Sequence, residues 1–340
     1  MSKNGIGIAL AIILFSSPTV HAEHTTDPIF ASGNLTCTTW GYSNITGGTG
    51  QDFMASQIRI KAGCKYKNFS SLFETDLSGL DDRVAANYIV QGWVAYNFGN
   101  EGLWGDIFSN VSLKVGRFQT AAGRTKPAPY NRITINEDEA NPFETFGTGV
   151  QMQAKLSDTV KIAADVTGAT GTSGLDKKNW SRIETSQIIT WEAVKGAGEK
   201  PLLELSFANQ WSDFFHRFGL EIGYSPTERF DFYAGLYRSD ENPLDKAARH
   251  VSGGFVLGDY LFYKDPKFHL RTHAMFDAFR GTENFDGYTV GIQGILPKGG
   301  GYGRMADSSV TIDWNQGVRW DKTSSPIEDK GVMLRIRIFF

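Results

Sequence analysis

The sequence predicts an all-β protein: a transmembrane, antiparallel, up-and-down β-barrel of about sixteen strands. Three observations support this prediction. Apolar and polar residues alternate with period two along most of the chain, short and long connections recur between the alternating stretches, and the final stretch is itself an alternating strand that ends on an aromatic residue. Successive side chains of a strand point to opposite faces, so each stretch has one apolar and one polar face.

The first strands come before the longest charged connection. Alternation is most regular in the second strand, where Arg59, Lys61 and Lys65 lie on one face and isoleucines on the other. Clusters of Gly, Pro, Asn and Asp mark the turns between strands. The predicted strands of this half are 34–42, 54–66, 69–78, 87–98 and 110–120.

Alternation resumes after residue 145. The strands predicted there are 150–156, 160–166, 187–193, 202–209, 217–224, 229–238, 253–263, 267–279, 288–296, 309–315 and 331–340. Tight turns, such as 67–68 and 264–266, follow even strands, whereas long connections, such as 121–145 and 168–185, follow odd ones. Barrels in the outer membrane have short turns on one rim and long loops on the other. The connection 99–108 is longer than this rule predicts, so twelve or fourteen strands also fit.

The N-terminus predicts a secretory signal peptide over residues 1–22. Lys3 precedes an apolar core over residues 6–15, and the small-residue site Val20-His21-Ala22 predicts cleavage before Glu23. The mature barrel would then comprise 23–340, after Sec-type export through the periplasm. No later stretch approaches the roughly 20 apolar residues of a spanning helix.

Composition narrows the classes of function. The chain has 34 basic and 37 acidic residues, so no global charge indicates nucleic acid as a partner. Hydrophobic residues make up 41% and aromatic residues 13% of the chain. These values also fit a soluble periplasmic all-β binding protein, whose strands would bury both faces.

The two cysteines, Cys37 and Cys64, flank the turn-rich segment 47–52, and their midpoint falls within it. If the flanking strands form one hairpin, the two residues are cross-strand neighbours, and an oxidising compartment favours a disulfide. The alternative is two buried thiols at unrelated positions.

The last strand, Gly331 to Phe340, has apolar residues on one face and Arg335 and Arg337 on the other. It resembles the C-terminal signal of bacterial outer-membrane β-barrels, in which the barrel assembly machinery recognises the final aromatic residue, here Phe340. The segment Leu-Lys-Val-Gly-Arg-Phe at 113–118 also resembles a strand of trimeric porins. The resemblance implies a porin in the outer membrane, surrounded by lipid, that assembles as a homotrimer and passes ions and small hydrophilic solutes by passive diffusion.

In porins the loop after the fifth strand folds inward and narrows the pore. The resemblance therefore implies that 121–145 is a constriction loop with four carboxylates, Glu137, Asp138, Glu139 and Glu144. We expect them to face a basic wall of lumen residues, Arg59, Lys61, Lys65, Arg271, Arg335 and Arg337. The alternative is that the acidic run is a solvated surface loop.

Two other functions fit parts of the sequence. A substrate-specific channel, for example for sugars, would need lumen aromatics, for which Tyr233 and Tyr237 are the candidates. His250 and Ser252 are similar to the base and nucleophile of outer-membrane phospholipase, but Ser-Gly-Gly replaces Ser-Asn-Gly and no orienting Asn follows at an obvious spacing. We expect no enzymatic activity, no cofactor and no metal site.

Overall fold

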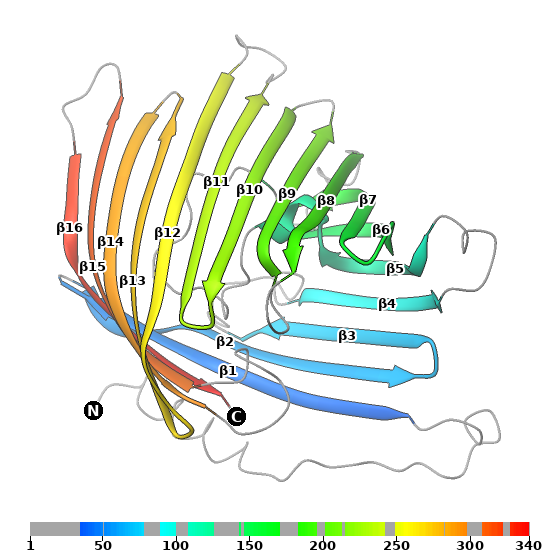
Figure 1. The fold of residues 1–340 in the computed structure, drawn as a ribbon, viewed down its shortest axis with the longest axis horizontal. Coiled ribbons are helices and arrows are strands. Elements are labelled where there is room, and N and C mark those ends of the chain that lie inside the picture. The colour runs from blue at the N-terminus through cyan, green and yellow to red at the C-terminus, as the bar shows by residue number, and fades with distance from the viewer. Residues whose placement is uncertain are drawn as a thin grey trace.

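The computed structural model describes residues 35–49, 51–77, 89–99, 108–125, 143, 146–170, 183–195, 201–212, 215–241, 249–281, 283–297, 308–321 and 327–339. They form sixteen antiparallel strands, each paired with its neighbours in the chain (Figure 1). β1 also pairs with β16, so the sheet closes into a barrel. The predicted fold class and strand number are therefore confirmed, and twelve or fourteen strands are excluded.

The strands are β1 Thr36–Gly48, β2 Gln51–Tyr66, β3 Phe69–Asp76, β4 Ile89–Gly99, β5 Ser109–Gln119, β6 Phe146–Lys155, β7 Val160–Thr170, β8 Glu184–Lys195, β9 Pro201–Ser212, β10 Phe215–Thr227, β11 Phe230–Glu241, β12 Arg249–Asp265, β13 Phe268–Arg280, β14 Glu283–Leu296, β15 Ser308–Asp321 and β16 Ile327–Phe339. A short 3₁₀ helix, η2 Ala122–Thr125, follows β5.

Most strands are longer than their sequence pattern predicts. β1 continues to Gly48 instead of ending near Tyr42, because its residues pair with β2 on one side and with β16 on the other. Register shifts after Asn44 and after Thr46 accommodate the weak strand-formers of this segment.

This lengthening also shortens several connections. β9 and β10 are separated only by residues 213–214, and β13 and β14 only by 281–282, although both connections follow odd strands. The predicted sorting of loop lengths by strand parity therefore holds for 121–145 and 171–183 but not around the whole barrel.

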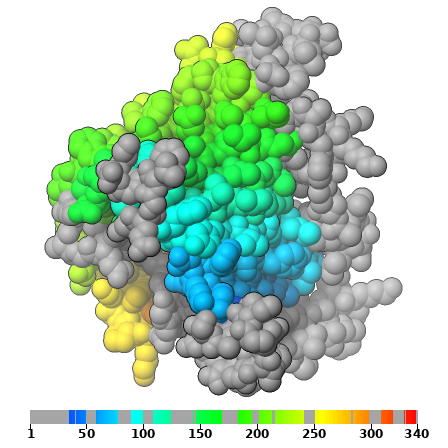
Figure 2. All heavy atoms as spheres, turned by 90° about the vertical axis from the view of Figure 1, so that its right-hand side faces the viewer, coloured from blue at the N-terminus to red at the C-terminus, as the bar shows by residue number. Residues whose placement is uncertain are grey.

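The two faces of the barrel wall differ in chemistry. The outer face carries large exposed apolar residues, including Leu236 at 67%, Val115 at 53% and Trp211 at 51% exposure. The inner face carries buried polar and charged residues on most strands, among them Glu74, Asp165 and Asp313. An apolar outside and a polar inside are typical of a transmembrane barrel of the outer-membrane type. Figure 2 shows this wall from one side, with blue, cyan and green strands stacked in chain order.

The predicted disulfide is present. Cys37 on β1 is the register partner of Cys64 on β2, with a Cα–Cα distance of 4.1 Å, and the two sulfurs are bonded. Both cysteines lie on the outward face, on the alternate positions to Tyr42 and Lys61, which are buried inside.

Some predictions lie outside the described residues: the signal peptide 1–22, the start of the mature domain 23–340, and Phe340. Within the described ranges, no helix is long and apolar enough to cross a membrane.

Candidate functional site: the barrel lumen

The barrel brings four of the six predicted bases together on β16 and β2, the two neighbours of β1. Closure places Arg335 and Arg337 of β16 opposite Thr46 and Asn44 of β1, and β2 follows β1 directly. Arg337 donates to Asn44 Oδ1 at 3.0 Å, and Arg335 donates to Thr311 Oγ1 of β15 at 3.4 Å. Both arginines are buried on the lumen face, which strand alternation predicts.

Carboxylates from the neighbouring strand pair with the bases of β2. Arg59 contacts Glu74 Oε1 at 3.1 Å and Asp76 Oδ2 at 3.3 Å, while Lys61 Nζ lies 3.0 Å from Glu74 Oε2. Gln91 donates to the same Glu74 oxygen at 2.8 Å. Strand alternation places Glu74 and Asp76 on the same face of β3, but their pairing with the bases of β2 was not predicted.

The remaining predicted bases lie at different places. Lys65 is exposed near the turn between β2 and β3. Arg271 lies further round on β13, buried, and forms ion pairs with Asp259 and with Asp231, the latter at 3.4 Å. Beside it on β13, His273 Nε2 contacts Asp313 Oδ1 at 2.7 Å. Arg271 therefore belongs to a second network, separate from the β16–β1–β2 wall.

The connection after β5 starts inside the barrel. Asp165 of β7 accepts hydrogen bonds from the backbone N–H of Ala121 at 2.5 Å and from Gln151 of β6 at 3.1 Å. Ser186 of β8 donates to Asp165 and accepts from the Ala122 N–H at 3.2 Å. Ala121 and Ala122 are completely buried. Side chains of β7 and β8 thus hold the backbone of this segment against the wall, and Gln151 of β6 supports Asp165.

Phe143, near the other end of the same connection, is also seated inside. It is 1% exposed, and its ring packs edge-on against Tyr237 of β11 with centroids 6.1 Å apart. Gly219 of β10 leaves room for this ring, because a Cβ there would lie 2.6 Å from Phe143 Cε2. Tyr237 in turn stacks on Phe255 of β12.

The seat for this connection is a row of small and apolar residues on the lumen wall. The strand register links Ala163 of β7 to Ile188 of β8, Ile188 to Ala208 of β9, Ala208 to Gly219, and Gly219 to Tyr237. Ala163, Ile188, Ala208 and Tyr237 form a buried hydrophobic cluster inside the barrel together with Ala121, Ala122 and Phe143. We call Ala163, Ile188, Ala208, Gly219 and Tyr237 the apolar row.

Sequence reasoning missed the apolar row. Its signal was available, because Ala163, Ile188 and Ala208 occupy lumen-facing positions where the alternation predicts polar residues. Three such exceptions on consecutive strands indicate that something other than water covers that part of the wall. Phe143 lies within the predicted constriction loop 121–145, but no role was predicted for it.

The predicted acidic residues Glu137, Asp138, Glu139 and Glu144 lie outside the described residues. Tyr237 faces the lumen as predicted and donates to Glu221 Oε1 at 2.5 Å, and Tyr233 lies on the same face of β11.

His250 and Ser252 are exposed on β12, on the positions that alternate with lumen-facing Phe255 and Asp259, and so belong to the outer face. His250 Nδ1 contacts Asp240 Oδ1 of β11 at 2.7 Å. Among the described residues, no cluster of His, Cys, Asp and Glu could hold a metal ion.

No protein-family model matches the sequence, and no curated protein matches it significantly. The fold is similar to solved outer-membrane proteins. A loop L8 deletion mutant of OmpT from Vibrio cholerae aligns with a TM-score of 0.61 and 11% identity, over 90% of this chain and 99% of that chain. The outer-membrane channel DcaP of Acinetobacter baumannii gives a TM-score of 0.60 and 11% identity, over 91% and 98%. An anion-selective porin from Comamonas acidovorans aligns with a TM-score of 0.56 and 8% identity, over 90% of this chain and 100% of that chain. The chain has a porin-type β-barrel fold.

Proposed function

We propose that the protein is an outer-membrane porin, a water-filled channel for passive diffusion of ions and small hydrophilic solutes that is narrowed by the segment 121–145. The observation that carries this proposal is the seating of both ends of that segment on the lumen wall, Ala121 and Ala122 at one end and Phe143 at the other. A loop that stayed on the surface of the protein would not bury these residues inside the barrel.

The position of the apolar row supports a pore with opposite charges on its two sides. η2 contacts β8 and β9, and β9 lies half-way round the sixteen-strand barrel from β1. The basic wall on β16, β1 and β2 therefore faces the seat from the far side of the lumen. We propose that Glu137, Asp138, Glu139 and Glu144 lie between them, where fields across a narrow gap would favour polar solutes.

We further propose that the barrel assembles as a homotrimer, because one of the solved structures with this fold is a trimer form of OmpT from Vibrio cholerae. A substrate-specific channel is a less favoured alternative, since Tyr237 already packs against Phe143 and Glu221. For His250 and Ser252, hydrolysis of dispersed phospholipid with and without calcium is the direct assay, and we expect none.

The first prediction concerns diffusion. Liposomes containing the purified protein should swell in a graded series of sugars at rates that fall with solute size, and planar bilayers should show stepwise conductance. A general pore sorts solutes by size, whereas a specific channel saturates. Liposomes that are no more permeable to sugars than protein-free ones would contradict the proposal. A swelling rate that saturates with one sugar would favour the specific channel.

A further inference from the structure

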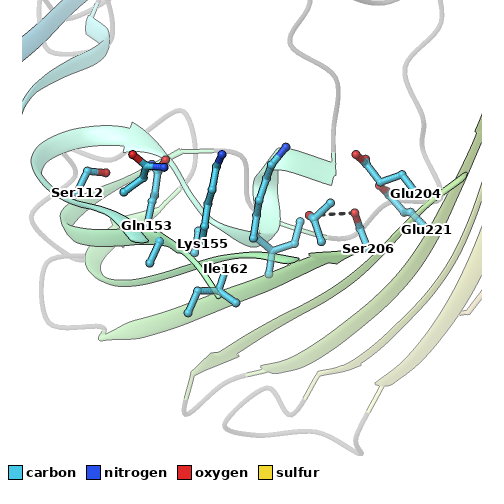
Figure 3. Close-up of a pocket in the computed structure, with 13 residues that line it drawn as sticks. Ser112, Gln153, Lys155, Ile162, Glu204, Ser206 and Glu221 are labelled. Atoms are coloured by element: carbon cyan, nitrogen blue, oxygen red, sulfur yellow. Dashed lines mark hydrogen bonds between the residues drawn. The ribbon is translucent and has the colours of Figure 1, made fainter. Parts of the chain in front are cut away.

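A cavity of about 350 Å³ lies in the lumen beside the apolar row, toward the turn between β6 and β7 (Figure 3). Residues of six consecutive strands, β5 to β10, line it. Figure 3 shows Lys155 on one side of this cavity and Glu204 and Glu221 on the other, all projecting from the wall in the same general direction.

The charges of this cavity are separated by sign. The register runs from Lys155 on β6 to Lys161 on β7, then to Thr190 on β8, Ser206 on β9 and Glu221 on β10. The two hydroxyls in the middle lie 3.2 Å apart and share a hydrogen bond. The cavity therefore has a basic end, a neutral hydroxyl floor and an acidic end.

Two of the four charged groups already have partners. Lys161 forms an ion pair with Glu192, and Glu221 accepts from the Tyr237 hydroxyl. Lys155 and Glu204, both half-buried, form no hydrogen bond or ion pair within the part of the chain that the structure describes, although Lys161 and Glu192 lie close enough to Glu204 to act on its charge.

The distance between these two groups explains why they do not pair with each other. Their strands, β6 and β9, are three strand spacings apart, or roughly 14 Å at the usual spacing. Two opposite charges are thus held apart, over hydroxyl groups that can accept and donate hydrogen bonds.

We propose that this cavity binds short zwitterionic peptides, an inference that rests on the proposed channel function. The peptide carboxylate would accept from the Lys155 ammonium group, the peptide ammonium would donate to the Glu204 carboxylate, and peptide amides would lie over Thr190 and Ser206. An extended tripeptide spans about 10 Å. The long side chains of Lys155 and Glu204 can extend toward its two ends and close the rest of the distance between their strands. The charges of a single α-amino acid lie too close together to contact both.

The test is single-channel recording in a planar bilayer at 0.1 M salt, where charge interactions are not fully screened. The probes are triglycine, N-acetyl-triglycine, triglycine amide and the doubly blocked N-acetyl-triglycine amide. Triglycine should interrupt the current with the longest residence time, the two singly blocked peptides should be weaker, and the doubly blocked peptide weakest.

Lys155→Gln and Glu204→Gln identify the contacts. Each should weaken triglycine binding by up to about fivefold, the factor that one solvated ion pair contributes. Lys155→Gln should make triglycine and its amide equivalent, because the carboxylate has lost its partner. Glu204→Gln should make triglycine and the N-acetyl form equivalent. Glu228→Gln and Lys267→Gln, which change charges at the exposed turns after β10 and β12, are the matched controls and should bind triglycine like the wild type.

The outcomes separate the two proposals. A barrel that conducts ions but treats all four peptides alike would overturn the zwitterion site and leave the channel intact. A neutral trisaccharide that blocks as strongly as triglycine would also overturn it, because the cavity would then recognise hydroxyls. A barrel that conducts no current would instead overturn the proposed function.

Discussion

The Phe143 ring packs closely against the backbone of Gly219, where any other residue would place its Cβ. A Cβ at position 219 would lie 2.6 Å from the Phe143 ring and 2.9 Å from Tyr237 Cδ1. We therefore predict that Gly219→Ala and Phe143→Ala both release one end of the segment 121–145 from the wall. Each variant should raise mean conductance and increase current noise, while the barrel still folds, since its backbone pairing does not involve Phe143. Planar-bilayer recording measures both effects.

A double variant sharpens this prediction. If the two residues act through the same contact, Gly219→Ala with Phe143→Ala should conduct like either single variant, because coupled residues are not additive. Phe276→Ala is the control, since it removes an equal side chain from the outer face. Phe143→Ala channels with wild-type conductance and noise would show that the seat does not set the pore.

The β1–β2 hairpin carries the disulfide. Cys37 and Cys64 close a loop with a sequence separation of 27, for which restriction of the unfolded chain contributes about 3–4 kcal/mol to the free energy of unfolding. Cys37→Ser with Cys64→Ser should lower the urea midpoint accordingly without changing conductance, because both residues lie on the outward face. Denatured wild type should bind no thiol reagent until it is reduced. Labelling of two thiols per chain without reductant would contradict the bond.

Alternation was enough to predict the strands, because the period of two follows from backbone geometry alone. It placed Arg59, Lys61 and Arg335 inside correctly. It did not give strand ends, since pairing on both sides extends β1 through Gly47 and Gly48, where local preference is weak. It also could not give contacts between distant segments: Phe143 packs against Gly219, and the two residues lie far apart in the chain.

At the scale of the whole barrel, charge decides ion preference. The lumen contains both signs: Arg59 and Lys61 pair with Glu74 and Asp76, and Arg271 pairs with Asp231 and Asp259. A single ring of one sign gives strong selectivity, whereas mixed charges give little. We therefore predict weak ion selectivity in the wild type, measured as the reversal potential in a salt gradient.

Two opposite changes test which charges matter. Arg335→Ser with Arg337→Ser removes positive charge from the basic wall and should shift the reversal potential toward cations. Neutralising Glu137, Asp138, Glu139 and Glu144 should shift it toward anions. Both shifts should shrink in molar salt, where the screening length falls to about 3 Å. Arg238→Ser with Arg280→Ser removes the same charge from the outer face and should leave selectivity unchanged. If the carboxylate variant selects like the wild type, the acidic run lies away from the ion path, and the narrowing must come from the seated ends of the segment alone.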